Sequence, residues 1–120
     1  MSTYKDLLAY KKAFSLAMKI FELSKKFPKD EIYSLTDQVR RSSRSVCANF
    51  AEALRRRKYP AHFLSKLSDS DSENAETEVW IDFSFACKYI SQTEHFELKN
   101  DQAEVGRLLG DILKSPEKYS

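Results

Sequence analysis

The chain has 120 residues, a length that accommodates one hydrophobic core and predicts a single domain, residues 1–120. Only two Gly and three Pro interrupt it, which favours long helices, and its formal net charge of +2 does not by itself indicate a nucleic-acid partner. It contains neither the apolar core of a signal peptide nor the roughly 20 apolar residues of a membrane span, so we expect a cytoplasmic protein with no membrane partner.

The first predicted helix covers residues 6–27 and carries more apolar surface than one neighbouring helix can cover. Its apolar side chains recur at spacings of three and four and form two adjacent stripes. Pro28 ends the helix because it lacks the N–H that would continue the hydrogen bonding, and because it restricts the residue before it. A monomeric bundle would leave part of this wide face exposed, so the pattern predicts oligomerisation.

The second predicted helix covers residues 31–57, and either Asp30 or Ser34 is expected to cap its start. Its unusual feature is that Ser42 and Asn49 share one helical stripe with apolar residues. Buried hydroxyl and amide groups need hydrogen-bond partners. Another element of the fold must therefore supply those partners.

The third predicted helix covers residues 60–91, with Pro60 at its first position, where proline is well tolerated. Its apolar residues gather near the two ends, and residues 68–77 between them are almost entirely polar. Taken alone, this middle segment could be an exposed linker. It contains no Gly or Pro, however, and the helical spacing continues on both sides, which favours one continuous helix.

The fourth predicted helix covers residues 94–114, between a cap at Thr93 and the proline at position 116. Gly106 and Gly110 stand one turn apart and are expected to let a neighbouring backbone approach closely. Four successive helices with short connections predict an all-α fold, an antiparallel up-and-down four-helix bundle.

The polar positions of the second and third helices are predicted to meet. If the two helices form a hairpin about Lys58, residues that face each other have numbers that sum to roughly 116. Ser42 then approaches Asn74. The arginines at positions 40, 41 and 44 approach Glu73 and Glu76, whose carboxylates the planar guanidinium can bind through two N–H groups. We expect this polar layer to fix the register of the hairpin more than to add stability, since desolvation offsets the attraction. Its expected members are Arg40, Arg41, Arg44, Ser42, Asn49, Glu73, Asn74 and Glu76.

The charge is distributed unevenly along the chain. Residues 40–58 contain seven bases and one acid, whereas residues 69–82 contain six acids and no base. The acids are expected to neutralise the first three arginines, but the last four bases have no comparable partners. Cations stabilise a helix C-terminus, yet four exceed that need. We therefore predict a nucleic-acid-binding site, where cations contact phosphates, at Arg55, Arg56, Arg57 and Lys58. The alternative is that these cations are only solvated and bind nothing.

The residue pattern predicts no catalytic, metal or cofactor site. His62 and His95 are expected near opposite ends of a helical hairpin, tens of ångströms apart. Glu73 and Glu76 could join a metal site in a bundle core, but the Glu-x-x-His partners are missing. The two cysteines lack metal or redox spacing and are expected to be small buried residues. We therefore expect a protein that is not an enzyme and needs no cofactor.

Several segments together match a family pattern: FPKDE at residues 27–31, LT at 35–36, QVRR at 38–41, SV at 45–46, ANFAE at 48–52, ETEVWI at 76–81 and CKYI at 87–90. They resemble the bacterial family of 23S rRNA intervening-sequence proteins, also called S23-like ribosomal proteins, over nearly the whole chain. That family is similar in fold to the accessory proteins of diversity-generating retroelements, which are basic, ring-forming bundles associated with a reverse transcriptase and nucleic acid. The resemblance therefore implies a four-helix bundle that forms a cyclic homo-oligomer, expected to be a pentamer, and it suggests a nucleic-acid partner.

Two functions are compatible with these patterns. In the first, the homo-oligomeric bundle binds structured RNA or DNA through its basic residues, repeated around a ring. In the second, it is a protein-interaction scaffold or accessory subunit, with a reverse transcriptase or another protein as partner and no direct nucleic-acid contact. Binding to a panel of RNAs and DNAs across salt concentration would distinguish the two.

Overall fold

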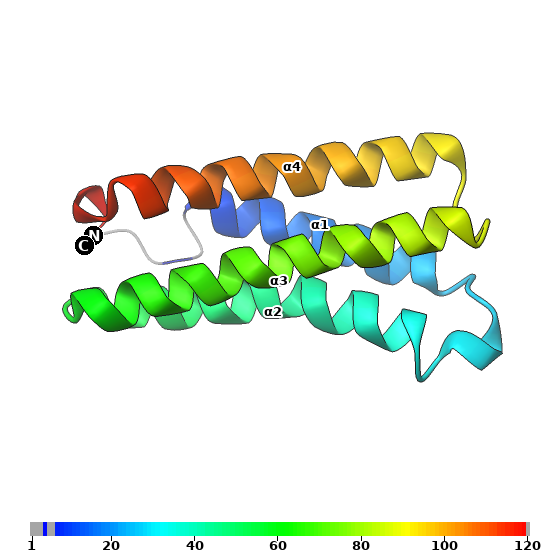
Figure 1. Ribbon diagram of the computed structural model, residues 1–120, viewed down its shortest axis with the longest axis horizontal. Coiled ribbons are helices and arrows are strands. Elements are labelled where there is room, and N and C mark those ends of the chain that lie inside the picture. Colours follow the sequence, from blue (N-terminus) through cyan, green and yellow to red (C-terminus); the bar gives the residue numbers. More distant parts are fainter. Residues whose placement is uncertain (1–3, 5–6, 120) are drawn as a thin grey trace.

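The structure, a computed structural model, describes residue 4 and residues 7–119. The described residues form four α-helices, with two short 3-10 helices between and after them. Consecutive α-helices run in opposite directions along the longest axis of the molecule (Figure 1). The fold is the antiparallel up-and-down four-helix bundle that the sequence predicts. The elements are α1 (Leu8–Ser24), η2 (Lys29–Glu31), α2 (Leu35–Arg55), α3 (Pro60–Ala86), α4 (Gln92–Lys114) and η3 (Pro116–Lys118).

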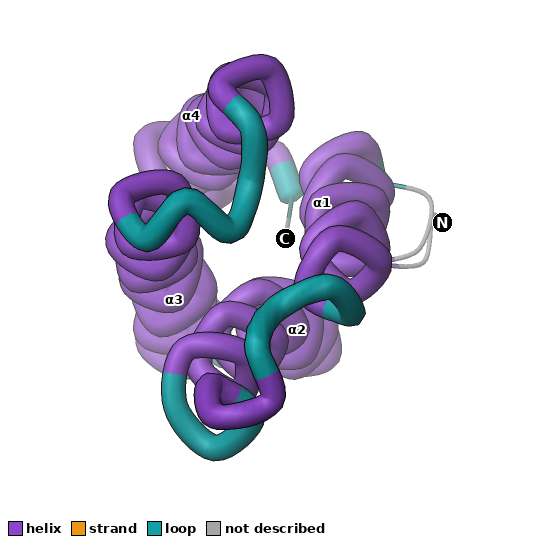
Figure 2. Tube along the Cα trace, turned by 90° about the vertical axis from the view of Figure 1, so that its right-hand side faces the viewer, coloured by secondary structure: helices purple, strands orange, loops and turns teal. Residues whose placement is uncertain are grey.

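Each α-helix packs against two neighbours. The helix α2 packs on α1 and α3, and α4 packs on α3 and α1. Seen along the bundle, the four helices therefore occupy the corners of a square, with α1 and α3 at opposite corners (Figure 2). The turn between α2 and α3 lies at the same end of the bundle as the start of α1 and the end of α4 (Figure 1). The predicted basic residues belong to this end.

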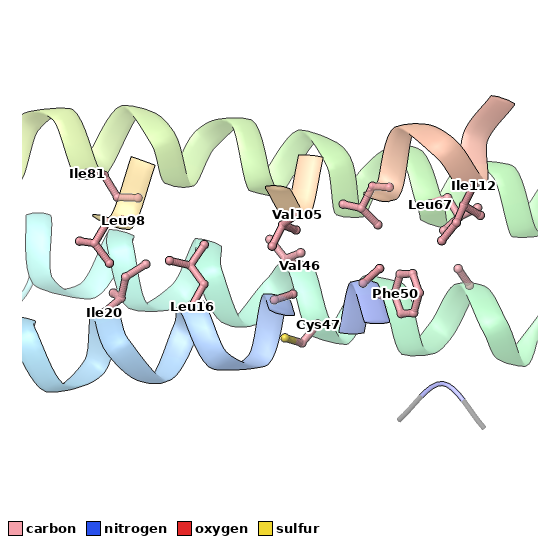
Figure 3. Packing of buried hydrophobic residues seen from close by; sticks show 14 of the residues in the cluster. Leu16, Ile20, Val46, Cys47, Phe50, Leu67, Ile81, Leu98, Val105 and Ile112 are labelled. Atoms are coloured by element: carbon pink, nitrogen blue, oxygen red, sulfur yellow. The ribbon is translucent and has the colours of Figure 1, made fainter. Parts of the chain in front are cut away.

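One hydrophobic core fills the space between the helices. Ile20 from α1, Ile81 from α3 and Leu98 from α4 lie close together toward one end, and Val46 lies near Val105 at mid-length (Figure 3). Fully burying a side chain of this size contributes about 1.5–3 kcal/mol. The third helix runs unbroken through its polar middle, as the absence of breakers predicts.

The boundaries of α1 and α2 differ from the expected ones. Instead of extending to Phe27, α1 ends at Ser24, and the Phe27 ring packs beside that of Tyr89, 5.3 Å between centroids. The next helix, α2, begins at residue 35 rather than 31. Ser34 precedes it but does not cap it, because its hydroxyl donates to the Glu31 carboxylate at 2.6 Å. The same carboxylate accepts the N–H of the first residue of α2 at 3.4 Å.

The turn between α3 and α4 also departs from expectation. Lys88 adopts a positive φ of 66°, and the N–H of Tyr89 donates back to the Ser84 carbonyl at 2.9 Å. This left-handed residue ends α3 at position 86, not 91, in an arrangement that glycine usually supplies. The predicted cap at Thr93 is wrong. Ser91 caps α4 instead, because its hydroxyl accepts from the Glu94 N–H while the Glu94 carboxylate accepts from the Ser91 N–H.

The two cysteines lie in different surroundings. Cys47 is buried, and burial raises the pKa of its thiol to about 11. Cys87 was expected to be buried but is exposed, because it follows the last residue of α3, outside the regular packing of the bundle. Of the helices in the described part of the chain, none is long and apolar enough to cross a membrane.

Candidate nucleic-acid interface

The four predicted phosphate-binding residues, here called the basic corner, surround the turn from α2 to α3. Arg55 is the last residue of α2, and Arg56, Arg57 and Lys58 form the turn. Three of them are exposed, whereas Arg57 is half-buried. Its Nε donates to the Leu54 carbonyl at 3.1 Å, so this cation helps to satisfy the end of α2. The other three are available to solvent.

The three exposed cations of the basic corner lack carboxylate partners among the described residues. Of the ion pairs between residues that the structure describes, none involves Arg55, Arg56 or Lys58. Glu52, the nearest acid along α2, pairs instead with Lys66 from α3 at 3.0 Å. Cations without carboxylate partners attract phosphate groups, and they bind them in a salt-dependent way.

An aromatic side chain adjoins the basic corner. Tyr59 follows it directly and is 58% exposed. Its ring meets the imidazole of His62 edge to face, with 6.3 Å between centroids. An exposed ring beside cations can stack on an unpaired base while the cations bind the flanking phosphates. Tyr59 was not among the residues predicted to bind nucleic acid.

In the polar layer, Arg41 alone makes the predicted arginine–carboxylate contact. Its Nη1 donates to the Glu73 carboxylate at 3.0 Å, and its Nη2 donates to Glu76. The hydrogen bond to Glu73 raises the pKa of Arg41, which keeps the guanidinium charged. Trp80 also donates to the Glu76 carboxylate, at 3.2 Å. Arg41 thus bridges α2 and α3 at the surface of the bundle.

The expectation that Arg40 and Arg44 also pair with these acids is wrong. Both guanidinium groups lie over the ring of Phe21 on α1, at 4.9 Å and 5.5 Å from its centroid. The Nε of Arg40 donates to the Ser24 hydroxyl at 2.7 Å. These two arginines face α1, whereas Arg41 faces α3. The hairpin register sets the height of a residue along the bundle but not the side of the helix on which it lies.

The buried polar residues pair with partners other than those predicted. Ser42 meets the hydroxyl of Thr77 at 2.9 Å rather than the amide of Asn74. Asn74 turns toward α4, where its Nδ2 donates to the backbone carbonyl of Gln102 at 3.1 Å. In return, the side-chain amide of Gln102 donates to the backbone carbonyl of Asn74 at 3.3 Å. The half-buried Asn49 donates to a carbonyl of its own helix at 3.0 Å. The polar centre of the bundle therefore joins three helices, not two.

Sequence reasoning missed several of these contributors. Thr77, Ser70 and Gln102 are all buried, and the Ser70 hydroxyl donates to the Val46 carbonyl at 2.7 Å. Gln102 had a detectable signal, because it stands at an otherwise apolar position of the fourth-helix stripe. The sequence carried no signal for the role of the Phe21 ring, since an aromatic residue beside a core stripe usually indicates packing alone.

The two histidines lie at separate places on the bundle. His95 lies 2.9 Å from Asp82 and stacks on Phe85, whereas His62 lies near the turn from α2 to α3. Within residue 4 and residues 7–119, no three His, Cys, Asp or Glu side chains are placed to hold a metal ion.

Comparisons with known proteins agree with this fold. The model of a family described as 23S rRNA-intervening sequence protein matches residues 5–111. Among solved structures, the chain is similar to a protein with unknown function from the S23 ribosomal protein family of Bacteroides thetaiotaomicron. The TM-score is 0.81 and the sequence identity 28%, over 90% of this chain and 96% of that one. No curated protein matches the chain. The similarity therefore extends over almost the full length of both structures, and neither description names an enzymatic activity.

Proposed function

The chain belongs to the family of 23S rRNA-intervening sequence proteins, and from this premise we propose that it is a non-enzymatic homo-oligomer that binds structured RNA or DNA through the basic corner. The observation that carries the proposal is the set of three exposed cations, Arg55, Arg56 and Lys58, beside the exposed ring of Tyr59. The related solved structure comes from a protein with unknown function, so the proposal depends on the surface of this chain.

The proposed mechanism of binding is electrostatic. The cations contact phosphate oxygens, which are the same in every sequence, so sequence preference is weak. Affinity falls steeply with salt because binding releases the counterions of the nucleic acid. Stacking of Tyr59 on an unpaired base adds a preference for loops or junctions over regular duplex.

Assembly strengthens this weak contact. One corner offers only three exposed cations, but a cyclic homo-oligomer presents the same corner several times to one nucleic-acid molecule. We propose a ring, and a pentamer in keeping with the family resemblance, acting in the cytoplasm. The two cysteines are both free thiols, which suits a reducing compartment.

A matched pair of variants tests the proposal. In the first, Arg55→Gln, Arg56→Gln and Lys58→Gln remove the exposed cations of the basic corner. In the second, Lys25→Gln, Lys26→Gln and Lys29→Gln remove three exposed cations from the opposite end of the bundle, with the same change in net charge. Fluorescence anisotropy with a labelled RNA hairpin, a DNA duplex and a single-stranded RNA measures the affinity of each protein at low salt.

The basic-corner variant should bind all three nucleic acids more weakly than the wild type, by at least about tenfold. The opposite-end variant should bind like the wild type. Equal affinities of the two variants, or no binding by the wild type at low salt, would refute the role of the basic corner.

The scaffold function is the second candidate, and a specific observation favours it. Phe14 and Met18 on α1 and Val79 and Phe83 on α3 are apolar side chains that remain about half exposed. Surfaces of this kind usually contact another protein. In this alternative the chain is an accessory subunit of a reverse transcriptase or another protein and does not contact nucleic acid. Absence of nucleic-acid binding by the intact oligomer would make it the preferred function.

A further inference from the structure

A groove between α1 and α2 exposes apolar side chains to solvent. It has a volume of about 390 Å³, and its lining includes Phe14 and Met18 from α1 and Ala48 and Ala51 from α2. Phe14 is 51% exposed and Met18 46%. Arg44 lines the same groove. We call this surface the α1–α2 groove.

A second exposed apolar surface follows the outer side of α3. Ala75, Val79 and Phe83 are all exposed and recur every fourth residue, so they form one continuous line along the helix. Phe83 is 51% exposed, and its ring packs beside that of Trp80 at 5.9 Å between centroids. We call this line of side chains the α3 ridge.

The two surfaces cannot meet within one molecule. The helices α1 and α3 stand at opposite corners of the bundle (Figure 2), so the α1–α2 groove and the α3 ridge face different directions. Each copy of the chain therefore offers a ridge at one side and a groove at another. A contact between them is head-to-tail, the kind of interface that generates closed rings when its rotation closes.

The charges at the two surfaces are complementary. Arg44, which lines the α1–α2 groove, lies over the ring of Phe21 and forms no ion pair with any carboxylate of the described residues. The α3 ridge is flanked by three acids, and α3 carries no base after Lys66. Arg41 and Lys99 from neighbouring helices contact these acids, so part of their charge is compensated within the chain. The flanking acids are Glu76, Glu78 and Asp82.

We infer that the α3 ridge of one copy packs into the α1–α2 groove of the next copy, with Phe83 and Val79 against Phe14 and Met18. The small side chains Ala48, Ala51 and Ala75 allow the helices to approach closely. Arg44 at the groove then lies near the acids that flank the ridge, which fixes the direction of the contact. This inference rests on the homo-oligomer of the proposed function, and it identifies the surfaces that build it.

Two single variants separate the surfaces. Phe14→Glu places a charge in the groove and leaves the ridge intact, whereas Phe83→Glu does the reverse. Both positions are half exposed, so each variant is expected to fold, and circular dichroism checks the helix content. Phe96→Glu is the matched control, because Phe96 is 66% exposed in the first turns of α4, outside both surfaces. Light scattering measures the mass of each protein and of their equimolar mixture.

Each of the two variants should be monomeric at a concentration where the wild type and Phe96→Glu assemble. Their mixture should form a 1:1 dimer, because the intact ridge of one variant can enter the intact groove of the other. A mixture that stays monomeric would overturn the head-to-tail contact, and assembly of either variant at the wild-type mass would overturn the choice of surface. A monomeric wild type would overturn the homo-oligomer itself, whereas nucleic-acid binding by the basic corner is measured independently of this result.

Discussion

Thr77 on α3 and Ser42 on α2 place their hydroxyl oxygens 2.9 Å apart at the centre of the bundle, where neither side chain is exposed to solvent. A second hydroxyl, that of Ser70, crosses the same interface to the Val46 carbonyl at 2.7 Å. A slip of α3 along α2 would take the buried Ser42 and Ser70 hydroxyls away from these partners, at a cost of about 1–3 kcal/mol each, whereas Thr77 would keep the bond to the Glu73 carbonyl of its own helix. The polar centre therefore fixes the register that carries every other contact of the hairpin.

Thr77→Val tests this role of the polar centre. The change keeps the shape of the side chain but leaves the Ser42 hydroxyl with only a long contact, 3.5 Å, to the Val39 carbonyl. We expect a loss of about 1–2 kcal/mol in the free energy of unfolding, measured by urea denaturation. Adding Ser42→Ala should cost less than it does in the wild type, because the hydroxyl is already unpaired. Strictly additive losses would show that the two hydroxyls do not interact.

Arg41 and Arg44 should differ in their contribution to stability. Arg41→Ala removes the contacts to Glu73 and Glu76 and should cost about 1 kcal/mol, since the side chain is half exposed and solvent screens the pair. Arg44→Ala removes only a cation–π contact to Phe21 and should cost less in the isolated subunit, about 0.5 kcal/mol. A double-mutant cycle with Glu73→Ala should show coupling for Arg41 and none for Arg44. Coupling to Arg44 would contradict the geometry described above.

The two glycines of α4 should respond oppositely to alanine. A Cβ at Gly110 meets nothing within 4 Å, so Gly110→Ala should stabilise the protein by about 0.5–1 kcal/mol through helix propensity. A Cβ at Gly106 would lie 3.2 Å from Nδ2 of Asn74, which is held by its hydrogen bond to the Gln102 carbonyl. Gly106→Ala should therefore destabilise the protein. Similar gains for both variants in thermal unfolding would show that the Asn74 side chain moves freely.

The hydrogen bond from Tyr89 to Glu31, 2.8 Å, predicts a specific pH dependence. It is the main cause that raises the pKa of Tyr89 to about 12, so its stabilisation is complete below the ordinary value of 10.0 and is lost as pH rises toward 12. The pKa of Glu31 is lowered by the hydrogen bond from the Ser34 hydroxyl and, second, by the one from Tyr89. The stability that the ionised Glu31 contributes is therefore present above the ordinary value of 4.5 and lost as pH falls through the lowered pKa.

Tyr89→Phe should therefore reduce the alkaline loss of stability and weaken the acidic one, while the bond from Ser34 persists. Urea denaturation across pH measures both the alkaline and the acidic loss of stability. Tyr33→Phe is the control, since Tyr33 is 92% exposed. An alkaline loss of stability in Tyr89→Phe equal to that of the wild type would contradict the role of this hydrogen bond.

The helices could be predicted from the sequence because their signals are local. Pro28 and Pro60 mark two of the turns, and the long stretches without Gly or Pro mark the helices. The end of α3 could not be predicted, because Lys88 takes a left-handed conformation that usually belongs to glycine. The cap at Ser91 was missed in favour of Thr93, although Glu94 three residues later is the sequence signal of a capping box.

The position of the polar centre along the bundle axis could be predicted, but the pairing of its side chains could not. The register brought Arg41 beside Glu73, as the summed residue numbers indicate. It did not distinguish Arg41 from Arg40, because neighbouring positions on a helix point about 100° apart and only the packed bundle decides which of them meets α1. Asn74 turned toward α4 for the same reason. The exposure of Arg55, Arg56 and Lys58 needed no such information, since cations at a helix end usually face solvent, whereas the half-buried position of Arg57 depends on its bond to the Leu54 carbonyl.

The salt dependence of RNA affinity is the most direct test of the claim that the basic corner binds phosphates. The logarithm of the association constant for an RNA hairpin is plotted against the logarithm of salt concentration, for the wild type, the variant lacking Arg55, Arg56 and Lys58, and the variant lacking Lys25, Lys26 and Lys29. We predict a steep negative slope for the wild type and the opposite-end variant, and a slope shallower by roughly 0.7–0.9 per lost phosphate contact for the basic-corner variant. Identical slopes for all three proteins would contradict the account.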